Sequence, residues 1–237
     1  MAVDDLPLPV VNFLNVIGVP WPYVDEDVLV EFASLTRRFA QAIDATHEDV
    51  TRAVAGIALA HQSAATDVMS SGWARMSEQH VRGLVDGCHM LASALDVAAG
   101  YIVAQKAEAI AVLVGLAGAF IADQAAAVAT AGLAEAAVPV LIASAQRVVR
   151  SLATDLQQHV IGEVIEAAAK PLMAKVEAAV AGLDWSAPRP GAATGVGTRF
   201  TVYPDEVGEQ LAVLRAHAAT MRSHGAQFAQ ALAGLGV

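Results

Sequence analysis

Apolar and small residues recur at every third or fourth position along two long stretches of the chain. After Phe32, the first stretch carries them at Leu35, Phe39, Ile43, Val50, Val54, Ile57, Ala64 and Val68, with Thr46 and His61 completing the spacing. The second stretch carries them at Val81, Leu84, Cys88, Leu91, Leu95, Ala98 and Ile102. Alternating steps of three and four residues are typical of a helix that buries one stripe of side chains. The pattern therefore predicts two long helices.

A short break separates the two stripes, at Met69-Ser-Ser-Gly-Trp73. Gly72 can adopt backbone angles that other residues avoid, and Ser71 can cap the helix that follows. We therefore expect a turn here, with Gly72 and Trp73 as its motif. Two matching stripes joined by a short turn predict an antiparallel helical hairpin.

The first 24 residues contain four prolines, Pro7, Pro9, Pro20 and Pro22. Each proline removes a backbone donor and disfavours helix in the residue before it, so residues 1–24 are predicted to form an extended arm. The arm segment Pro20-Trp21-Pro22 holds an indole in a restricted backbone, which suits packing against a helix pair. The acids of Asp25-Glu-Asp27 suit the positive end of a helix dipole, so the first long helix is predicted to begin there.

Beyond Ile102, residues 106–135 and 149–182 are helical in composition, with kinks expected at Pro139 and Pro171. Residues 184–200 read as a Gly/Pro linker, and residues 201–237 as a separate unit made of one amphipathic helix that starts near Pro204. The predicted fold is all-α. It is a long antiparallel helical hairpin, extended by further kinked helices into an elongated bundle over residues 25–183.

Composition and charge limit the kinds of function. The chain has 24 acidic and 14 basic residues and a formal charge of −10, which repels phosphate backbones, so nucleic acid is not expected as a partner. Cys88 is the single cysteine, which excludes an internal disulfide. The sequence has no Gly-x-Ser-x-Gly or His-Glu-x-x-His motif. We therefore expect neither catalysis nor a cofactor.

Targeting signals of the general kind are not apparent. Residues 1–5 carry two acids where a signal peptide has basic residues, and no apolar segment with a cleavage site follows. The longest apolar run, residues 109–122, is shorter than the roughly 20 residues that span a bilayer. A buried helix is the preferred interpretation of this run.

His61 and His80 lie at nearly equal distances from the predicted turn, so they could meet across the hairpin. Such a pair could bind a metal ion or respond to pH. No acid or thiolate completes a ligand set around them, and partly buried, hydrogen-bonded histidines are the ordinary alternative.

Several short motifs then point to a known family: Leu6-Pro-Leu-Pro9, Gly18-Val-Pro-Trp-Pro22, Asp25-Glu-Asp27 and the Gly72-Trp73 pair. Over about residues 5–183 the chain resembles the Trp-x-Gly-like N-terminal domain of actinobacterial type VII (ESX-like) secretion substrates and toxins. The resemblance implies a protein made in the cytoplasm and exported to the cell envelope or beyond. It also implies that the hairpin pairs with a second helical hairpin and is recognised by the secretion machinery.

Two positions depart from the family pattern. Arg75 stands where the family's Trp-x-Gly turn has glycine, and the family's Tyr-x-x-x-Asp/Glu signal has Gln105 four residues after Tyr101. Tyr23 does have Asp27 at that spacing, although helix capping also explains this acid. Tyr23, Asp27 and Tyr101 are therefore the candidate export-signal residues.

Three hypotheses of function result, ranked in this order. The first is a secretion-targeting domain that binds a helical-hairpin partner or a second copy of itself. The second is a membrane-active, pore-forming protein whose segments 109–122 and 125–134 insert as a hairpin. The third is a metal-dependent enzyme with its metal at His61 and His80.

Overall fold

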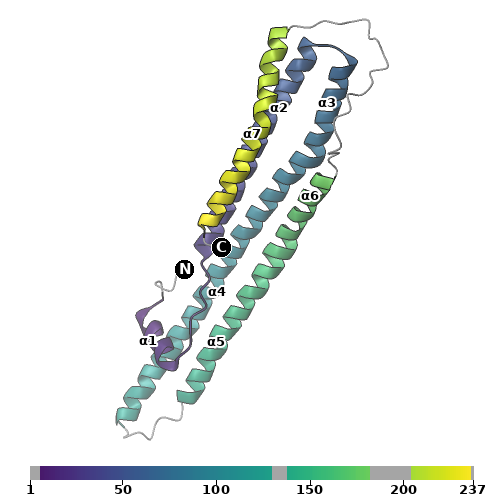
Figure 1. Ribbon diagram of the computed structural model, residues 1–237. Helices are drawn as coiled ribbons and strands as arrows, with labels where there is room; N and C mark the ends of the chain where they lie inside the picture. Colours follow the sequence, from purple (N-terminus) through teal and green to yellow (C-terminus); the bar gives the residue numbers. More distant parts are fainter. Residues whose placement is uncertain (1–5, 130–137, 182–203, 236–237) are drawn as a thin grey trace. The chain divides into compact units, whose positions relative to one another are not determined.

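The computed structural model describes residues 6–129, 138–181 and 204–235, and every regular element in these ranges is helical (Figure 1). The elements are α1 (Leu8–Ile17), α2 (Glu26–Ala60), α3 (Ala64–Met76), the π-helix η2 (Ser77–Val81), α4 (Arg82–Ala129), α5 (Val138–His159), the π-helix η4 (Val160–Ala169), α6 (Lys170–Ala181) and α7 (Pro204–Gly234). The all-α prediction is confirmed. The predicted linker, residues 184–200, lies outside the described residues.

Contacts within the chain divide it into two compact units. Unit 1 comprises Met1–Val30 and Ala94–Glu166, and unit 2 comprises Glu31–Ser93 and Ala167–Val237. Helices α2 and α4 each contribute residues to both units because the boundaries fall within them. Each unit is described by itself.

The predicted extended arm is wrong over residues 8–17, which form α1. Pro7 caps this helix and Pro9 lies in its first turn, where a backbone N–H has no partner within the helix, so both prolines are tolerated. The helix ends at Gly18, whose φ of 68° places it in the left-handed region. Residues 19–25 follow without regular structure.

Unit 1 has a core made of α1, α4 and α5. Val10, Phe13 and Leu14 share one face of α1 and are buried against α4 and α5. The helix α4 contributes Leu113 and Ala117 to this cluster, and α5 contributes Ala145 and Val149. Trp21 packs at the edge of the cluster, and also against the neighbouring cluster that α4 and α5 form at Ile102, Ala109, Leu152 and Leu156.

Unit 2 contains the antiparallel hairpin, but its turn lies at residues 61–63 and not at Met69–Trp73. The Ser63 side chain accepts a hydrogen bond from the Thr66 backbone, and the Thr66 hydroxyl accepts one from the Ser63 backbone, so α3 starts with a complete capping box. Gly72 and Trp73 lie inside α3, which makes the predicted turn motif wrong. In the described residues, Gly18 is the glycine with positive φ.

The stripe predicted in α2 is confirmed from Ile43 to Ile57, where Val50 and Val54 are also buried. Earlier in α2 the buried positions are one residue later than predicted, at Ala33, Thr36 and Ala40. Leu35 and Phe39 are therefore only half-buried, and Phe39 stacks on Phe228 of α7, with ring centroids 4.6 Å apart. The helix α7 therefore contacts α2 through Phe39, one residue before the fully buried Ala40.

The predicted stripe of α4 is confirmed from Cys88 to Ile102. Pro139 is the second residue of α5, so it begins this helix and the kink predicted there is wrong. Pro171 follows the π-helix η4, whose wider turns suit a residue that cannot donate to the preceding turn. The helix α7 packs within unit 2, which corrects the prediction of a separate C-terminal unit.

Candidate functional site

A buried ion pair in unit 1 fixes the segment that carries Tyr23 and Asp27. The Lys106 ammonium group on α4 donates hydrogen bonds to the Glu26 carboxylate, at 2.6 Å, and to the Val24 carbonyl oxygen. Lys106 is 1% exposed and Glu26 is 4% exposed. Burial lowers the pKa of Lys106, and the nearby carboxylates of Asp25 and Asp27 oppose this shift. The lysine therefore ties the start of α2 to α4.

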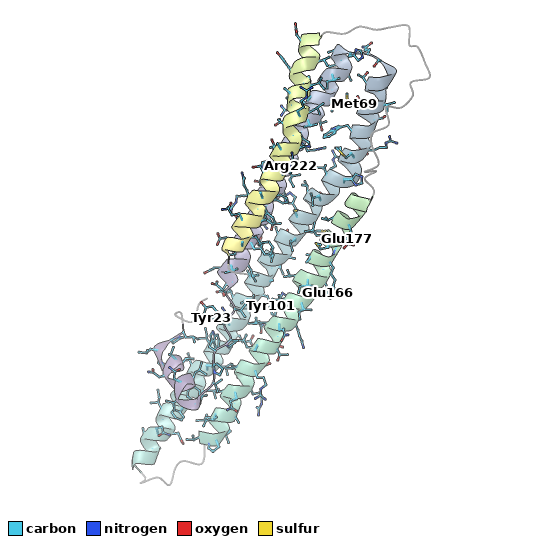
Figure 2. All side chains as sticks on the ribbon, in the orientation of Figure 1. Tyr23, Met69, Tyr101, Glu166, Glu177 and Arg222 are labelled. Carbon is cyan, nitrogen blue, oxygen red and sulfur yellow. The ribbon has the colours of Figure 1, made fainter. Side chains whose placement is uncertain are left out.

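The candidate export-signal residues lie in unit 1 in different surroundings. Tyr23 is 69% exposed, just before α2, and Asp27 is exposed in the first turn of that helix. The Asp27 N–H donates to Asp25 Oδ1 at 3.0 Å, so the cap of α2 comes from Asp25. Tyr101 is half-buried on α4 and stacks on His159 of α5, with ring centroids 3.8 Å apart. Both tyrosines are labelled in Figure 2.

Trp73 lies at the centre of a cluster formed by α2, α3, η2 and α7. Its indole stacks on His47, with ring centroids 4.9 Å apart, and meets the edge of His217 at 5.8 Å. The indole Nε1 donates to Thr51 Oγ1 at 2.9 Å. His47 Nε2 shares a hydrogen bond of 2.5 Å with Ser77 Oγ. We call these five residues the Trp73 cluster.

The hydrogen bonds of the Trp73 cluster set the register of the hairpin. The His47–Ser77 bond spans 30 residues and the Thr51–Trp73 bond spans 22 residues, and both spans are centred on Gln62. The same centre falls in the turn at residues 61–63. Trp73 therefore joins two helices along their length, where the sequence predicted that it would form the turn.

The surroundings of His47 and His217 favour the neutral form of both side chains. Burial lowers the pKa of His47, as do the nearby His217 and Arg82, while Asp44 and Glu48 oppose the shift. Burial also lowers the pKa of His217. The buried Nδ1 atoms of His47 and His217 have no hydrogen-bond partner. A proton added to either atom would be buried without an acceptor.

A second seam of α4 consists of exposed residues. Its members are small or aliphatic and are all exposed: Val97, Gly100, Ala104, Ala107, Ala111, Val114, Gly118 and Ile121. Gly100, Ala104 and Ala111 follow buried residues by two positions, about 200° around the helix, whereas Ala107, Val114 and Gly118 directly follow buried residues, about 100° around it. We call this set the outer face of α4. Lys106, which is buried, and Glu108 are the charged residues between Val97 and Ala122.

The candidate metal ligands do not form a site. His61 lies at the turn itself, and His80 is 17 residues beyond Ser63 along α3 and η2, which is roughly 25 Å at the rise of a helix. In residues 6–129, 138–181 and 204–235, no group of three or more His, Cys, Asp or Glu side chains could hold a metal ion. The predicted meeting of His61 and His80 is therefore wrong, because the turn lies elsewhere.

Sequence reasoning missed the outer face and two histidines of the Trp73 cluster. The outer face was detectable, since α4 carries apolar residues at heptad spacing in two phases, and only one phase was identified as a seam. His47 and His217 give no such signal, because their proximity depends on how α7 packs against the hairpin.

One described helix, within Arg82–Ala126 of α4, is long and apolar enough to cross a membrane, and 17% of its most apolar window is buried. This combination matches the exposure of the outer face. The uninterrupted apolar run, residues 109–122, is shorter than a bilayer span, but the helix that contains it is long enough.

Comparison with known proteins identifies the family. Residues 5–156 match the family model described as "WXG100 like domain", and this range runs from the start of α1 through most of α5. No curated protein and no solved structure shows a significant match. Because the family match covers more than half of the chain, the chain belongs to the WXG100-like family and is a helical protein of the type VII secretion-substrate kind.

Proposed function

We propose that this chain is a type VII secretion substrate whose targeting domain pairs with a second helical protein for export, and that the outer face of α4 is the pairing surface. The observation that carries this proposal is the continuous exposure of that face. Val97 and Ile121, at its two ends, are each 59% exposed. A contiguous apolar surface of this kind marks an interaction site on a protein.

The geometry of the outer face favours a helix as the binding partner. Its residues follow alternating steps of three and four, which is the spacing that a partner helix fills with knobs-into-holes packing. From Val97 to Ile121 the face is about 36 Å long, at the rise of a helix. Gly100 and Gly118 leave gaps that let a second helix approach closely.

The export signal of this proposal is the segment with Tyr23 and Asp27. Both side chains are exposed, whereas Tyr101 is half-buried against His159. The Lys106 contacts with Val24 and Glu26 hold the intervening backbone in place. A receptor of the secretion machinery would therefore meet Tyr23 and Asp27 in a fixed arrangement.

The pairing is tested with the full chain, alone and co-expressed with a small helical protein encoded next to it, by measuring mass with light scattering. We expect a one-to-one complex. Ala107→Arg, which places a charge in the middle of the outer face, should abolish this complex. The matched control Ala153→Arg makes the same change at an exposed position of α5, and the complex should persist.

Two results would contradict this proposal. A complex that forms equally well with Ala107→Arg would exclude the outer face as the pairing surface. A chain that stays a monomer with every neighbouring helical protein would exclude pairing itself. The signal is tested separately by secretion of Tyr23→Ala and Asp27→Asn from a host with the type VII machinery, with Tyr101→Phe as the comparison.

The second candidate function is membrane activity, because α4 is long and apolar enough to cross a bilayer. In this alternative the outer face would contact lipid instead of a protein helix. The purified chain would then release dye from liposomes, and Ala107→Arg would reduce that release. A chain that binds its partner and leaves liposomes intact would support pairing and exclude this alternative.

A further inference from the structure

The helix α7 has a seam of its own that is partly polar. Its half-buried residues recur at steps of three and four: Val207, Gln210, Leu214, His217, Met221, His224, Phe228 and Ala231. Every second member of this seam is apolar and large, whereas Gln210, His217 and His224 are polar and seven residues apart. None of the described side chains of α7 is fully buried. This helix is therefore held less firmly than one with an apolar seam.

The polar members of the seam contact the hairpin directly. His224 Nε2 shares a hydrogen bond of 2.9 Å with Thr46 Oγ1 of α2. Gln210 lies against Gly56, where a Cβ atom would meet the glutamine side chain at 3.2 Å. Higher residue numbers of α7 meet lower numbers of α2, so the two helices are antiparallel, and Figure 1 shows α7 lying along α2.

The contact between α7 and the hairpin leaves space unfilled. A groove of about 340 Å³ is lined by Leu35, Phe39 and Arg38 of α2 and by His224 and Phe228 of α7. The apolar contact beside it is the stacked pair of Phe39 and Phe228. The His224–Thr46 hydrogen bond and the Phe39–Phe228 pair therefore both hold α7 against α2.

The Trp73 cluster lies in the same contact and contains two histidines from opposite sides. His47 comes from α2 and His217 from α7, and the Trp73 indole packs against both rings. Each ring has a buried Nδ1 atom without a hydrogen-bond partner. Protonation of both rings would place two positive charges around one indole and create two buried donors without acceptors.

The neighbouring charges do not cancel this effect. On α2, Asp44 and Glu48 favour the protonated form of His47, whereas Arg82 of α4 and His217 of α7 disfavour it, and burial is the largest influence. From α3 and η2 the ring meets Trp73 and Ser77, which carry no charge. For His217, burial is the cause of the shift.

We propose that α7 is an acid-released cover of the α2–α3 hairpin, which leaves the hairpin when His47 and His217 take up protons. Its release would expose Phe39 and Trp73, together with the apolar groove beside Phe39. This surface belongs to unit 2, whereas the outer face residues belong to unit 1, so the proposal goes beyond the proposed function and does not depend on it.

The direction of the pH effect follows from the two histidines. In the docked state burial holds the pKa of both histidines below the ordinary value of 6.5. Release of α7 removes the part of that burial that α7 supplies, so both pKa values rise toward the ordinary value. The released state therefore binds protons more readily. Docking is at full strength above pH 6.5, weakens as the pH falls below it, and weakens no further below the lowered pKa values. Each histidine contributes up to a tenfold change in the docking equilibrium per pH unit, as about 1.36 kcal/mol per unit implies.

Hydrogen exchange of the full chain, followed by mass spectrometry, tests this proposal. The measurement compares about pH 7.5 with about pH 5, on either side of the ordinary pKa of histidine, after correction for intrinsic exchange. We expect peptides of α7 to lose at least tenfold in protection at the lower pH. Peptides of α5, in unit 1, should keep their protection.

Variants assign the effect to the two histidines. His217→Leu should keep α7 protected at both pH values, because leucine extends the apolar part of the seam. His47→Phe tests the same contact from the hairpin and should also reduce the loss of α7 protection at the lower pH. The matched control His89→Gln removes an exposed histidine of α4 and should behave like the unmodified chain. Equal protection of α7 at the two pH values in the unmodified chain would overturn the proposal. The proposal would also be overturned if α7 lost as much protection at the lower pH in both histidine variants as in the unmodified chain.

Discussion

Lys106 occupies a position in α4 where the seam otherwise contains apolar side chains. Ile102, Ala109 and Leu113 are its neighbours in this seam, and all of them are buried. A buried ammonium group is costly unless charged and polar partners surround it, and here Glu26 and Val24 supply them. Neither its place in the seam nor its partner could be predicted, because alternating steps of three and four lead from Ile102 to Gln105, and Glu26 is 80 residues away.

The first prediction concerns this pair. Glu26→Gln removes a buried charge and leaves the ammonium group without it, which should lower the free energy of unfolding by about 3 kcal/mol. Lys106→Met should cost a similar amount for the converse reason. The double variant should cost clearly less than the two single variants together, since it leaves neither charge unpaired. Urea unfolding followed by circular dichroism measures all three, and additive costs would show that the two groups act independently.

Trp73 shows how a residue can be identified correctly and its role misjudged. The break in the apolar stripe at Met69-Ser-Ser-Gly-Trp73 indicated a turn at Gly72 and Trp73, but the break between the helices is set by Ser63 and Thr66. The usual signature of a capping box has Glu or Gln at the fourth position, and here a threonine hydroxyl replaces it. The turn was therefore predicted about nine residues too late, near Ser71 instead of Gln62, and this error also produced the expectation that His61 and His80 meet.

At the scale of the elements, the repeat of apolar residues predicted most of α2 and α4. It did so because burial of one stripe is the main contribution to the stability of such helices. It did not predict α1, where two prolines within three residues suggested extended chain. N–H groups in the first turn of a helix have no acceptor within the helix, so the prolines cost no hydrogen bond there. Val10, Phe13 and Leu14 supply the buried face.

Substitution of two glycines by alanine should change the stability of the chain in opposite directions. Gly18 ends α1 with a φ of 68°, and Gly100 lies in the middle of α4, and a Cβ atom added at either would meet nothing within 4 Å. Gly18→Ala should destabilise the chain by about 1 kcal/mol, because alanine is strained at positive φ. Gly100→Ala should stabilise it by about 0.5–1 kcal/mol through helix propensity. Thermal unfolding of both variants measures the difference, and shifts of the same sign would refute this account of the two backbones.

At the scale of the whole molecule, the charge of −10 makes binding of a different protein and binding of a second copy respond differently to salt. Two copies repel each other, so screening by salt should strengthen self-association. A complex with a basic partner is held by attraction, so the same screening should weaken it. We expect the dissociation constant of the complex to rise when NaCl increases from about 50 mM to about 500 mM. Sedimentation measurements over this range check the prediction, and tighter binding at high salt would indicate pairing between copies.

The family itself was accessible from short motifs, and the site only in part. Tyr23, Asp27 and Tyr101 could be named because the family pattern includes them. The outer face of α4 required knowledge of which phase of the repeat is buried. The Trp73 cluster required the packing of α7, which no local pattern in the sequence encodes. The Trp73 cluster was thus beyond sequence reasoning because its residues are far apart in the sequence, whereas the outer face lies on one helix and was missed because only one phase of the repeat was identified.

The position of α7 in the chain has a consequence for events on the ribosome. The helix begins 144 residues after α2 ends, and at roughly 5–20 residues per second this corresponds to about 7–30 s of translation. During that interval the hairpin can form while its α7-facing side, including Phe39, is still uncovered. A protein that reaches this side first would keep α7 from docking. The order of synthesis therefore lets a binding partner reach this side of the hairpin before α7 exists.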